Sequence, residues 1–128
     1  MGLDQYAYIA TKAIEDERSF AQQRELAYWR KHPNLQGWME RLWIEKGRPN
    51  IPEDHVNDST FNGVELELTW EDLERLEKDI TDSNLPYTEG FFFGSPSDDY
   101  YREQDLKFIR EAKAELFLGL RVFYNSSW

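Results

Sequence analysis

The sequence predicts a small α+β domain in which about three antiparallel or mixed strands carry helices packed on one face. Three observations favour this class. Residues 64–68 alternate strictly between apolar and acidic side chains, which is typical of a half-buried strand. Apolar residues recur at helical spacing over 35–46, 70–82 and 99–118. Because 128 residues is the length of one ordinary domain, we expect a single domain over 1–128.

The chain before residue 32 predicts a strand followed by a helix. Residues 3–10 are rich in tyrosine, which favours a strand with Tyr6 and Tyr8 on one face. The residues from about 20 to 31 include several good helix formers, so we expect a helix there. Trp29 would then pack this helix against the apolar face of the next one.

A turn around Pro33 should separate these two helices. Proline lacks a backbone N–H and disfavours helical geometry in the residue before it, so His32 should leave the helical path. Asn34 can then cap the second helix over 35–46. Residues 47–60 hold two prolines and many short polar side chains, and they predict a long polar loop within the domain.

The C-terminal half predicts two helices and a last strand. Thr69 should cap the helix that follows the alternating strand, and Asp72 would complete a capping box. Residues 90–96 place three phenylalanines between glycines, which fits either a short buried strand or an aromatic-lined turn. A helix over 99–118 and a terminal strand over 121–125 complete the expected order.

Composition and charge exclude several classes of protein. The chain has no cysteine, which excludes disulfides and thiolate zinc sites. It has no long apolar run and no basic N-terminal region, so we expect no membrane span, no signal peptide and a cytoplasmic location. The net charge is −10, and residues 64–115 carry fifteen acidic against six basic side chains. This negative field disfavours general nucleic-acid binding and suits a basic partner.

No motif of a known catalytic class is present, and we predict no catalytic residue, no metal site and no cofactor. His32 lies among cations and could carry a proton, although a turn residue before proline is the simpler interpretation. Glu65 and Glu67 share one strand face and could bind a divalent metal in a small hydrolase. Charged side chains are common on the solvent face of a strand, so this is the least favoured hypothesis.

Aromatic and cationic side chains gather in the segment 28–32, Tyr-Trp-Arg-Lys-His. Aromatic rings can stack on a nucleobase while Arg or Lys binds phosphate, which is a common way to bind a small nucleotide. The simpler interpretation is that the rings belong to the core and the cations lie at its rim.

Four motifs together resemble a family of small phage and prophage proteins, and the resemblance runs from end to end. They are Met-Gly-Leu-Asp-Gln-Tyr at 1–6, Tyr-Trp-Arg-Lys at 28–31, Gly-Phe-Phe-Phe-Gly-Ser at 90–95 with Asp-Tyr-Tyr at 99–101 and Asp-Leu at 105–106, and Tyr-Asn-Ser-Ser-Trp at 124–128. Such proteins are often labelled phosphoglycerate kinase. That enzyme is a far larger two-domain protein, and this chain has no phosphate-binding loop. Gln36 stands about where relatives often have a histidine, and glutamine cannot titrate.

The favoured hypothesis is a phage-encoded accessory protein in the host cytoplasm that binds a small anionic or nucleotide-like ligand without catalysis. The predicted ligand-binding residues are Trp29, Arg30, Lys31, His32, Phe92, Tyr101, Ser127 and Trp128. The alternative is an acidic interaction module. In that case the surface of residues 64–115 would bind a basic host protein, as an inhibitor or a DNA mimic.

Overall fold

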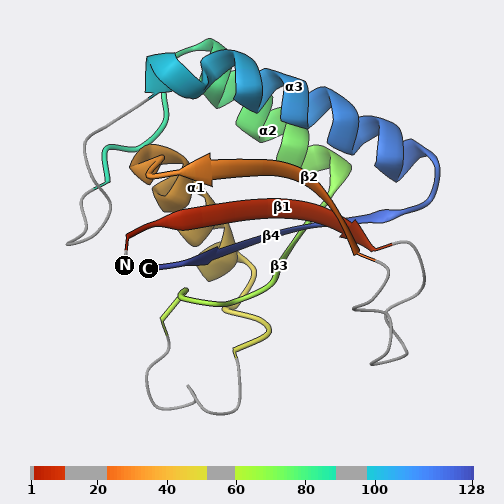
Figure 1. Ribbon diagram of the computed structural model, residues 1–128, viewed down its shortest axis with the longest axis horizontal. Coiled ribbons are helices and arrows are strands. Elements are labelled where there is room, and N and C mark those ends of the chain that lie inside the picture. Colours follow the sequence, from red (N-terminus) through yellow and green to blue (C-terminus); the bar gives the residue numbers. More distant parts are fainter. Residues whose placement is uncertain (1, 11–22, 52–59, 89–97) are drawn as a thin grey trace.

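The computed structural model describes residues 2–10, 23–51, 60–88 and 98–128 and contains one four-stranded antiparallel sheet with three helices (Figure 1). The strands are β1 (Asp4–Ala10), β2 (Gln23–Arg30), β3 (Leu66–Leu68) and β4 (Arg121–Ser127), and the helices are α1 (Pro33–Glu45), α2 (Trp70–Thr81) and α3 (Asp98–Phe117). The strand order across the sheet is β2-β1-β4-β3. The predicted α+β class is confirmed, with four strands where about three were expected.

The two faces of the sheet have different surroundings. Gln5 lies between Trp29 of β2 and Ser126 of β4, and all three are buried under the helices. The neighbouring positions of the same strands point the other way, and no described helix crosses in front of that face (Figure 1). We call it the open face. Tyr6 and Tyr8 both lie on the open face, as predicted. Ala7 and Ile9, which alternate with them, are buried on the other face.

Large aromatic side chains join the sheet to the helices in a single core. Trp29 meets Phe108 of α3 edge-on, with ring centroids 5.2 Å apart, and lies 6.3 Å from the ring of Tyr124 in β4. Trp43 of α1 meets Phe61 at 5.1 Å. Each such side chain contributes about 1.5–3 kcal/mol by leaving water. Within the described residues, no helix is long and apolar enough to cross a membrane.

The helix predicted over about 20–31 is wrong for the residues that the structure describes, because 23–30 form β2. Their helix propensity is good, but β1 offers a partner along its whole length, and sheet pairing overrides a weak local preference. Trp29 therefore reaches the core from a strand and not from a helix. Tyr28 and Arg30 point to the open face instead.

The start of α1 also differs from the prediction. The helix begins at Pro33, which needs no hydrogen-bond acceptor at this position because it lacks the N–H. His32 is the N-cap residue and makes no side-chain cap, so the predicted cap by Asn34 is wrong. The segment of three phenylalanines and most of the predicted loop over 47–60 lie outside the described residues.

The capping box of α2 is confirmed. The Thr69 hydroxyl accepts from the backbone N–H of Asp72 at 3.2 Å, and the Thr69 N–H donates to the Asp72 carboxylate at 2.9 Å. The predicted inward positions Val64, Leu66 and Leu68 are buried as well. These elements follow from local sequence alone.

Replacing Thr69 with alanine should lower the free energy of unfolding by about 1 kcal/mol, because an N–H of the first turn loses its acceptor. Urea denaturation followed by circular dichroism measures this loss. Thr81→Ala is the matched control, since Thr81 is exposed at the other end of α2 and should change stability by less than about 0.5 kcal/mol. Equal losses in the two variants would contradict a stabilising cap.

Candidate functional site

His32 and Asp105 form a buried pair where β2 ends and α1 begins. Nε2 of His32 lies 2.8 Å from Oδ2 of Asp105, and the Trp29 indole donates to Oδ1 at 2.7 Å. The side chains of His32 and Asp105 are 0% and 2% exposed. Burial raises the pKa of Asp105, and the hydrogen bond from His32 opposes this shift. Both carboxylate oxygens therefore have donors in the core.

Gln5 of β1 binds the backbone of the same turn. Its amide accepts from His32 N–H at 2.8 Å and donates to His32 C=O at 3.0 Å. It also donates to the Tyr124 hydroxyl at 2.9 Å, and this hydroxyl donates to Gln36 of α1 at 2.5 Å. Burial raises the pKa of Tyr124, so the hydroxyl stays protonated. These contacts hold the turn although Lys31 adopts left-handed backbone, with φ of 57°.

Tyr101 of α3 connects this network to the end of β2. Its ring stacks on the His32 imidazole with centroids 4.9 Å apart. Its hydroxyl accepts from Arg30 N–H at 3.0 Å and donates to Arg30 C=O at 2.7 Å. The backbone of Arg30 is thus fixed by α3 while its side chain lies on the open face.

Asn34 joins two segments that are distant in sequence. Its amide accepts from Thr88 N–H at 2.9 Å and donates to Asp98 Oδ2 at 3.1 Å. The chain at Thr88 packs so tightly on α1 that a Cβ at Gly37 would lie 1.8 Å from the Thr88 hydroxyl. Only glycine fits at this position of α1 without rearrangement, and the two hydrogen bonds of Asn34 connect α1 to Thr88 and to the first turn of α3.

On the open face, aromatic rings lie beside a cation. The rings of Tyr6 and Tyr28 are 5.1 Å apart, and the two residues are 37% and 40% exposed. Arg30 Nη1 lies 3.1 Å from Asp4 Oδ1, which also accepts from the Tyr28 hydroxyl at 2.6 Å. That hydrogen bond and the charge of Arg30 lower the pKa of Asp4, although partial desolvation opposes them. Ser127 of β4 pairs with Asp4 of β1, on the side of β1 that faces away from β2.

The structure divides the predicted ligand-binding residues between core and surface. The buried ones are Trp29, His32 and Tyr101. The exposed ones are Arg30, Lys31 and Ser127. Trp128 is half-buried against the core, and Phe92 lies outside the described residues. Because successive residues of a strand point to opposite faces, Trp29 and Arg30 cannot line the same pocket.

Several residues of the network carried no prediction of a role. They are Gln5, Asp105 and Tyr124, together with Asp4 and Tyr6 on the open face. The sequence did contain a signal for a buried role of Asp105. It follows Tyr101 by one helical turn and precedes Phe108 by another, so it is a lone carboxylate on an apolar helix face.

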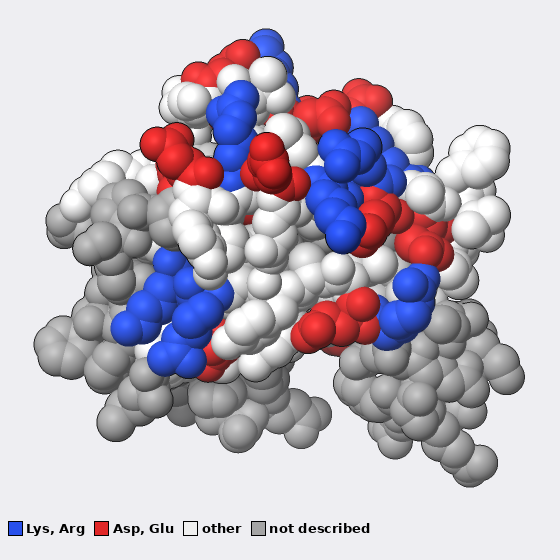
Figure 2. Space-filling model, turned by 45° about the horizontal axis from the view of Figure 1, so that its top comes forward, with Lys and Arg blue, Asp and Glu red and all other residues white. Residues whose placement is uncertain are grey.

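The acidic residues of 64–115 are mixed with cations at the surface. Asp72 pairs with Lys46 at 2.5 Å, and Glu77 pairs with Lys113 at 3.5 Å. Acidic and basic side chains alternate across the face that Figure 2 presents. A uniform negative field of the kind a DNA mimic needs is weakened by this arrangement.

Glu65 and Glu67 lie on the open face, and each has a partner there. The Tyr8 hydroxyl donates to Glu65 at 2.5 Å. Arg121 binds Glu67 through two nitrogens, at 2.7 and 2.8 Å, and lowers the pKa of that carboxyl. Among the described residues, no group of three or more His, Cys, Asp or Glu side chains could hold a metal ion.

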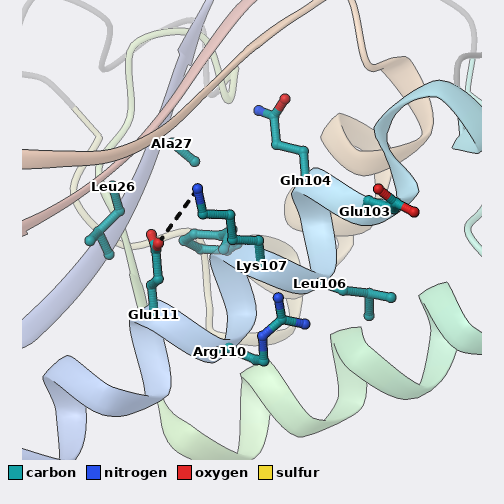
Figure 3. A pocket seen from close by; sticks show the side chains of 9 residues that line it. Leu26, Ala27, Glu103, Gln104, Leu106, Lys107, Arg110 and Glu111 are labelled. Atoms are coloured by element: carbon teal, nitrogen blue, oxygen red, sulfur yellow. Dashed lines mark ion pairs between the residues drawn. The ribbon is translucent and has the colours of Figure 1, made fainter.

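A hollow of about 770 Å³ lies between β2 and α3. Leu26, Ala27 and Phe108 supply its apolar lining, and Lys107 and Glu111 form an ion pair of 4.0 Å beside it (Figure 3). None of the predicted ligand-binding residues lines this hollow.

Comparison of the chain with protein-family models, with curated proteins and with solved structures gives no match. The resemblance to small phage proteins therefore stays a prediction. A functional conclusion has to come from the geometry of the residues described above.

Replacing Asp105 with alanine should lower the free energy of unfolding by about 3–5 kcal/mol, because it leaves the N–H groups of His32 and Trp29 buried without an acceptor. Urea denaturation measures the loss. Asp79→Ala is the matched control: Asp79 also accepts from an indole, that of Trp38 at 2.8 Å, but is only half-buried, so about 1 kcal/mol is expected.

Asp105→Asn keeps an oxygen acceptor and tests the same role if Asp105→Ala does not fold. Asp105→Asn should shift the Trp29 indole N–H signal in ¹H–¹⁵N spectra while the protein remains folded. Equal stability losses for Asp105→Ala and Asp79→Ala, or an unmoved Trp29 signal, would contradict the central role of this carboxylate.

Proposed function

We propose that the protein binds, without catalysis, a small anionic ligand that carries a planar ring, with a nucleotide as the type of ligand. The site would be the end of the open face formed by β1 and β2. The observation that carries this proposal is the pair of exposed rings, Tyr6 and Tyr28, next to the guanidinium of Arg30. We call these residues, with Asp4 and Lys31, the open-face site.

The two tyrosines can receive a flat ring. Stacking of a base on an aromatic side chain contributes about 1–3 kcal/mol and accepts any base. The hydroxyl of Tyr28 is bound to Asp4, which limits the positions of the ring before a ligand arrives. Less conformational entropy is then lost on binding.

Arg30 and Lys31 can receive the anionic group. The guanidinium of Arg30 is about half-exposed and offers a planar fork that matches phosphate geometry. Asp4 offsets part of its charge. The whole chain carries −10, which repels a polyanion far more than a single nucleotide. This balance favours a small ligand over a nucleic acid.

The buried pair His32–Asp105 lies in the core and not on the open face, so we propose that the open-face site serves binding. Tyr28, Arg30, Lys31 and Ser127 all belong to the motifs that resemble small phage proteins. We therefore propose a phage-encoded accessory protein that senses or sequesters a nucleotide in the host cytoplasm.

Isothermal titration with adenosine monophosphate and with adenosine tests the two halves of the site separately. Adenosine monophosphate should bind more tightly, because adenosine lacks the phosphate. Tyr28→Ala should weaken both ligands by about tenfold or more. Arg30→Ala should lower the affinity for adenosine monophosphate more than that for adenosine, while Lys31 keeps part of the contribution of the phosphate. Asp4→Asn should raise the affinity for adenosine monophosphate, because Arg30 loses the carboxylate that competes with the phosphate.

Arg41→Ala is the matched control, since Arg41 is exposed on α1 away from the open face. It should leave both affinities unchanged. Absence of heat with either ligand would refute the proposal. So would wild-type affinity in Tyr28→Ala and Arg30→Ala proteins whose circular dichroism spectra show them folded.

A further inference from the structure

Asn62 and Gly63 form the middle of a tight turn that leads into β3. The N–H of Val64 donates to the Phe61 carbonyl at 3.4 Å. Gly63 has φ of 75°, and the third residue of a type II turn has φ of about 80°, which glycine adopts without strain. Of the asparagines in the sequence, Asn62 alone precedes a glycine. The turn therefore places a side-chain amide next to a backbone nitrogen that no Cβ shields.

A peptide bond from asparagine to glycine has a characteristic reaction. The glycine nitrogen attacks the side-chain carbonyl carbon of the asparagine, the new C–N bond closes a succinimide ring, and the amide nitrogen leaves as ammonia. The proton of the attacking nitrogen departs with the ammonia. Water then opens the ring at either carbonyl and leaves aspartate or isoaspartate. The overall change is the hydrolysis of an amide, so water is the only reactant that the protein has to receive.

In this protein both reacting groups are bound by the residues at the end of β4. The Gly63 N–H donates to the Ser126 carbonyl at 2.7 Å. The Asn62 carboxamide accepts from the Trp128 N–H at 3.2 Å and donates to the Trp128 carbonyl at 3.3 Å. Deprotonation of the Gly63 nitrogen requires the first hydrogen bond to break, and departure of the Asn62 amide nitrogen requires the last to break.

We propose that Asn62 is a site of spontaneous deamidation and that the end of β4 controls the reaction. While Ser126 and Trp128 stay bound to the turn, the reaction is slow. Local opening of these two residues frees both reacting groups and costs less than global unfolding. Trp128 is half-buried against the core, so its packing sets how often the turn is released.

The products cannot restore the contacts of the amide. A carboxylate has no N–H to donate to the Trp128 carbonyl, and it brings negative charge beside that oxygen. Isoaspartate also inserts a methylene into the backbone of the turn, which changes the spacing between Phe61 and Val64. Deamidation therefore weakens the link between this turn and the end of β4.

Peptide mass spectrometry after incubation at neutral pH in H₂¹⁸O tests the proposal, because opening of the succinimide places a heavy oxygen in the product. In wild-type protein unfolded by urea, Asn62 should react faster than Asn125, which precedes a serine. In folded protein, Asn62 should react at least about tenfold more slowly than in unfolded protein. The Gly63 N–H should be protected from hydrogen exchange by a similar factor, since both processes need this proton to leave the Ser126 carbonyl.

Trp128→Ala should speed the reaction of Asn62 in folded protein at least about threefold, because the residue that binds the carboxamide loses its packing. Trp70→Ala is the matched control and should leave the rate unchanged. Trp70 is 40% exposed at the start of α2, beyond the other end of β3. Gly63→Ala should slow the reaction in urea, because a Cβ then shields the attacking nitrogen.

Four results would overturn the proposal. The first is an Asn62 that reacts no faster than Asn125 in urea. The second is an equal rate in folded and unfolded protein. The third is a faster reaction in folded protein, in which case the Trp128 N–H activates the Asn62 carbonyl and does not protect it.

The fourth is the wild-type rate in Trp128→Ala protein whose circular dichroism spectrum shows it folded. The comparison of folded with unfolded wild-type protein decides the matter if Trp128→Ala does not fold.

Discussion

The carboxylate of Asp105 is the group on which the arrangement of sheet and helices depends. Its two oxygens accept from the Trp29 indole and the His32 imidazole, so one side chain of α3 fixes both the end of β2 and the turn after it. Gln5 fixes the backbone of the same turn from β1. A carboxylate is expensive to remove from water and is tolerated here because both oxygens are paired. We infer that the network mainly specifies position and adds less to net stability.

Side chains of neighbouring segments bind the outer edges of the sheet. On β2, the Tyr101 hydroxyl binds the N–H and C=O of Arg30, and Gln104 donates to the Tyr28 carbonyl at 2.6 Å. At the other edge, Lys46 donates to a carbonyl of β3 at 2.7 Å. Unpaired edge groups are where a further strand would add. The side chains of Tyr101, Gln104 and Lys46 thus occupy backbone groups to which another strand could otherwise bind.

Sequence patterns were sufficient where the structure is decided locally and failed where distant pairing decides it. The capping box at Thr69 and the inward positions predicted over 64–68 involve near neighbours, and both are confirmed, although the strand itself covers only Leu66–Leu68. The segment 23–30 has good helix formers and becomes a strand because β1 pairs with it. At the site, residues 28–32 are neighbours in the sequence, which suggested one cluster of rings and cations. Successive side chains of β2 point to opposite faces of the sheet, so these residues are divided between the core and the surface. The contact between His32 and Asp105 spans 73 residues, a separation at which local patterns give no signal.

The same alternation places the open-face site and the buried His32–Asp105 pair on opposite sides of one short segment. Arg30 presents its side chain to the open face, while Tyr101 binds its backbone and stacks on His32. Lys31 connects these positions in a left-handed backbone conformation, with φ of 57°. A shift of the Arg30 backbone would therefore move the Tyr101 ring and the His32 imidazole stacked on it, because close-packed interiors transmit such shifts.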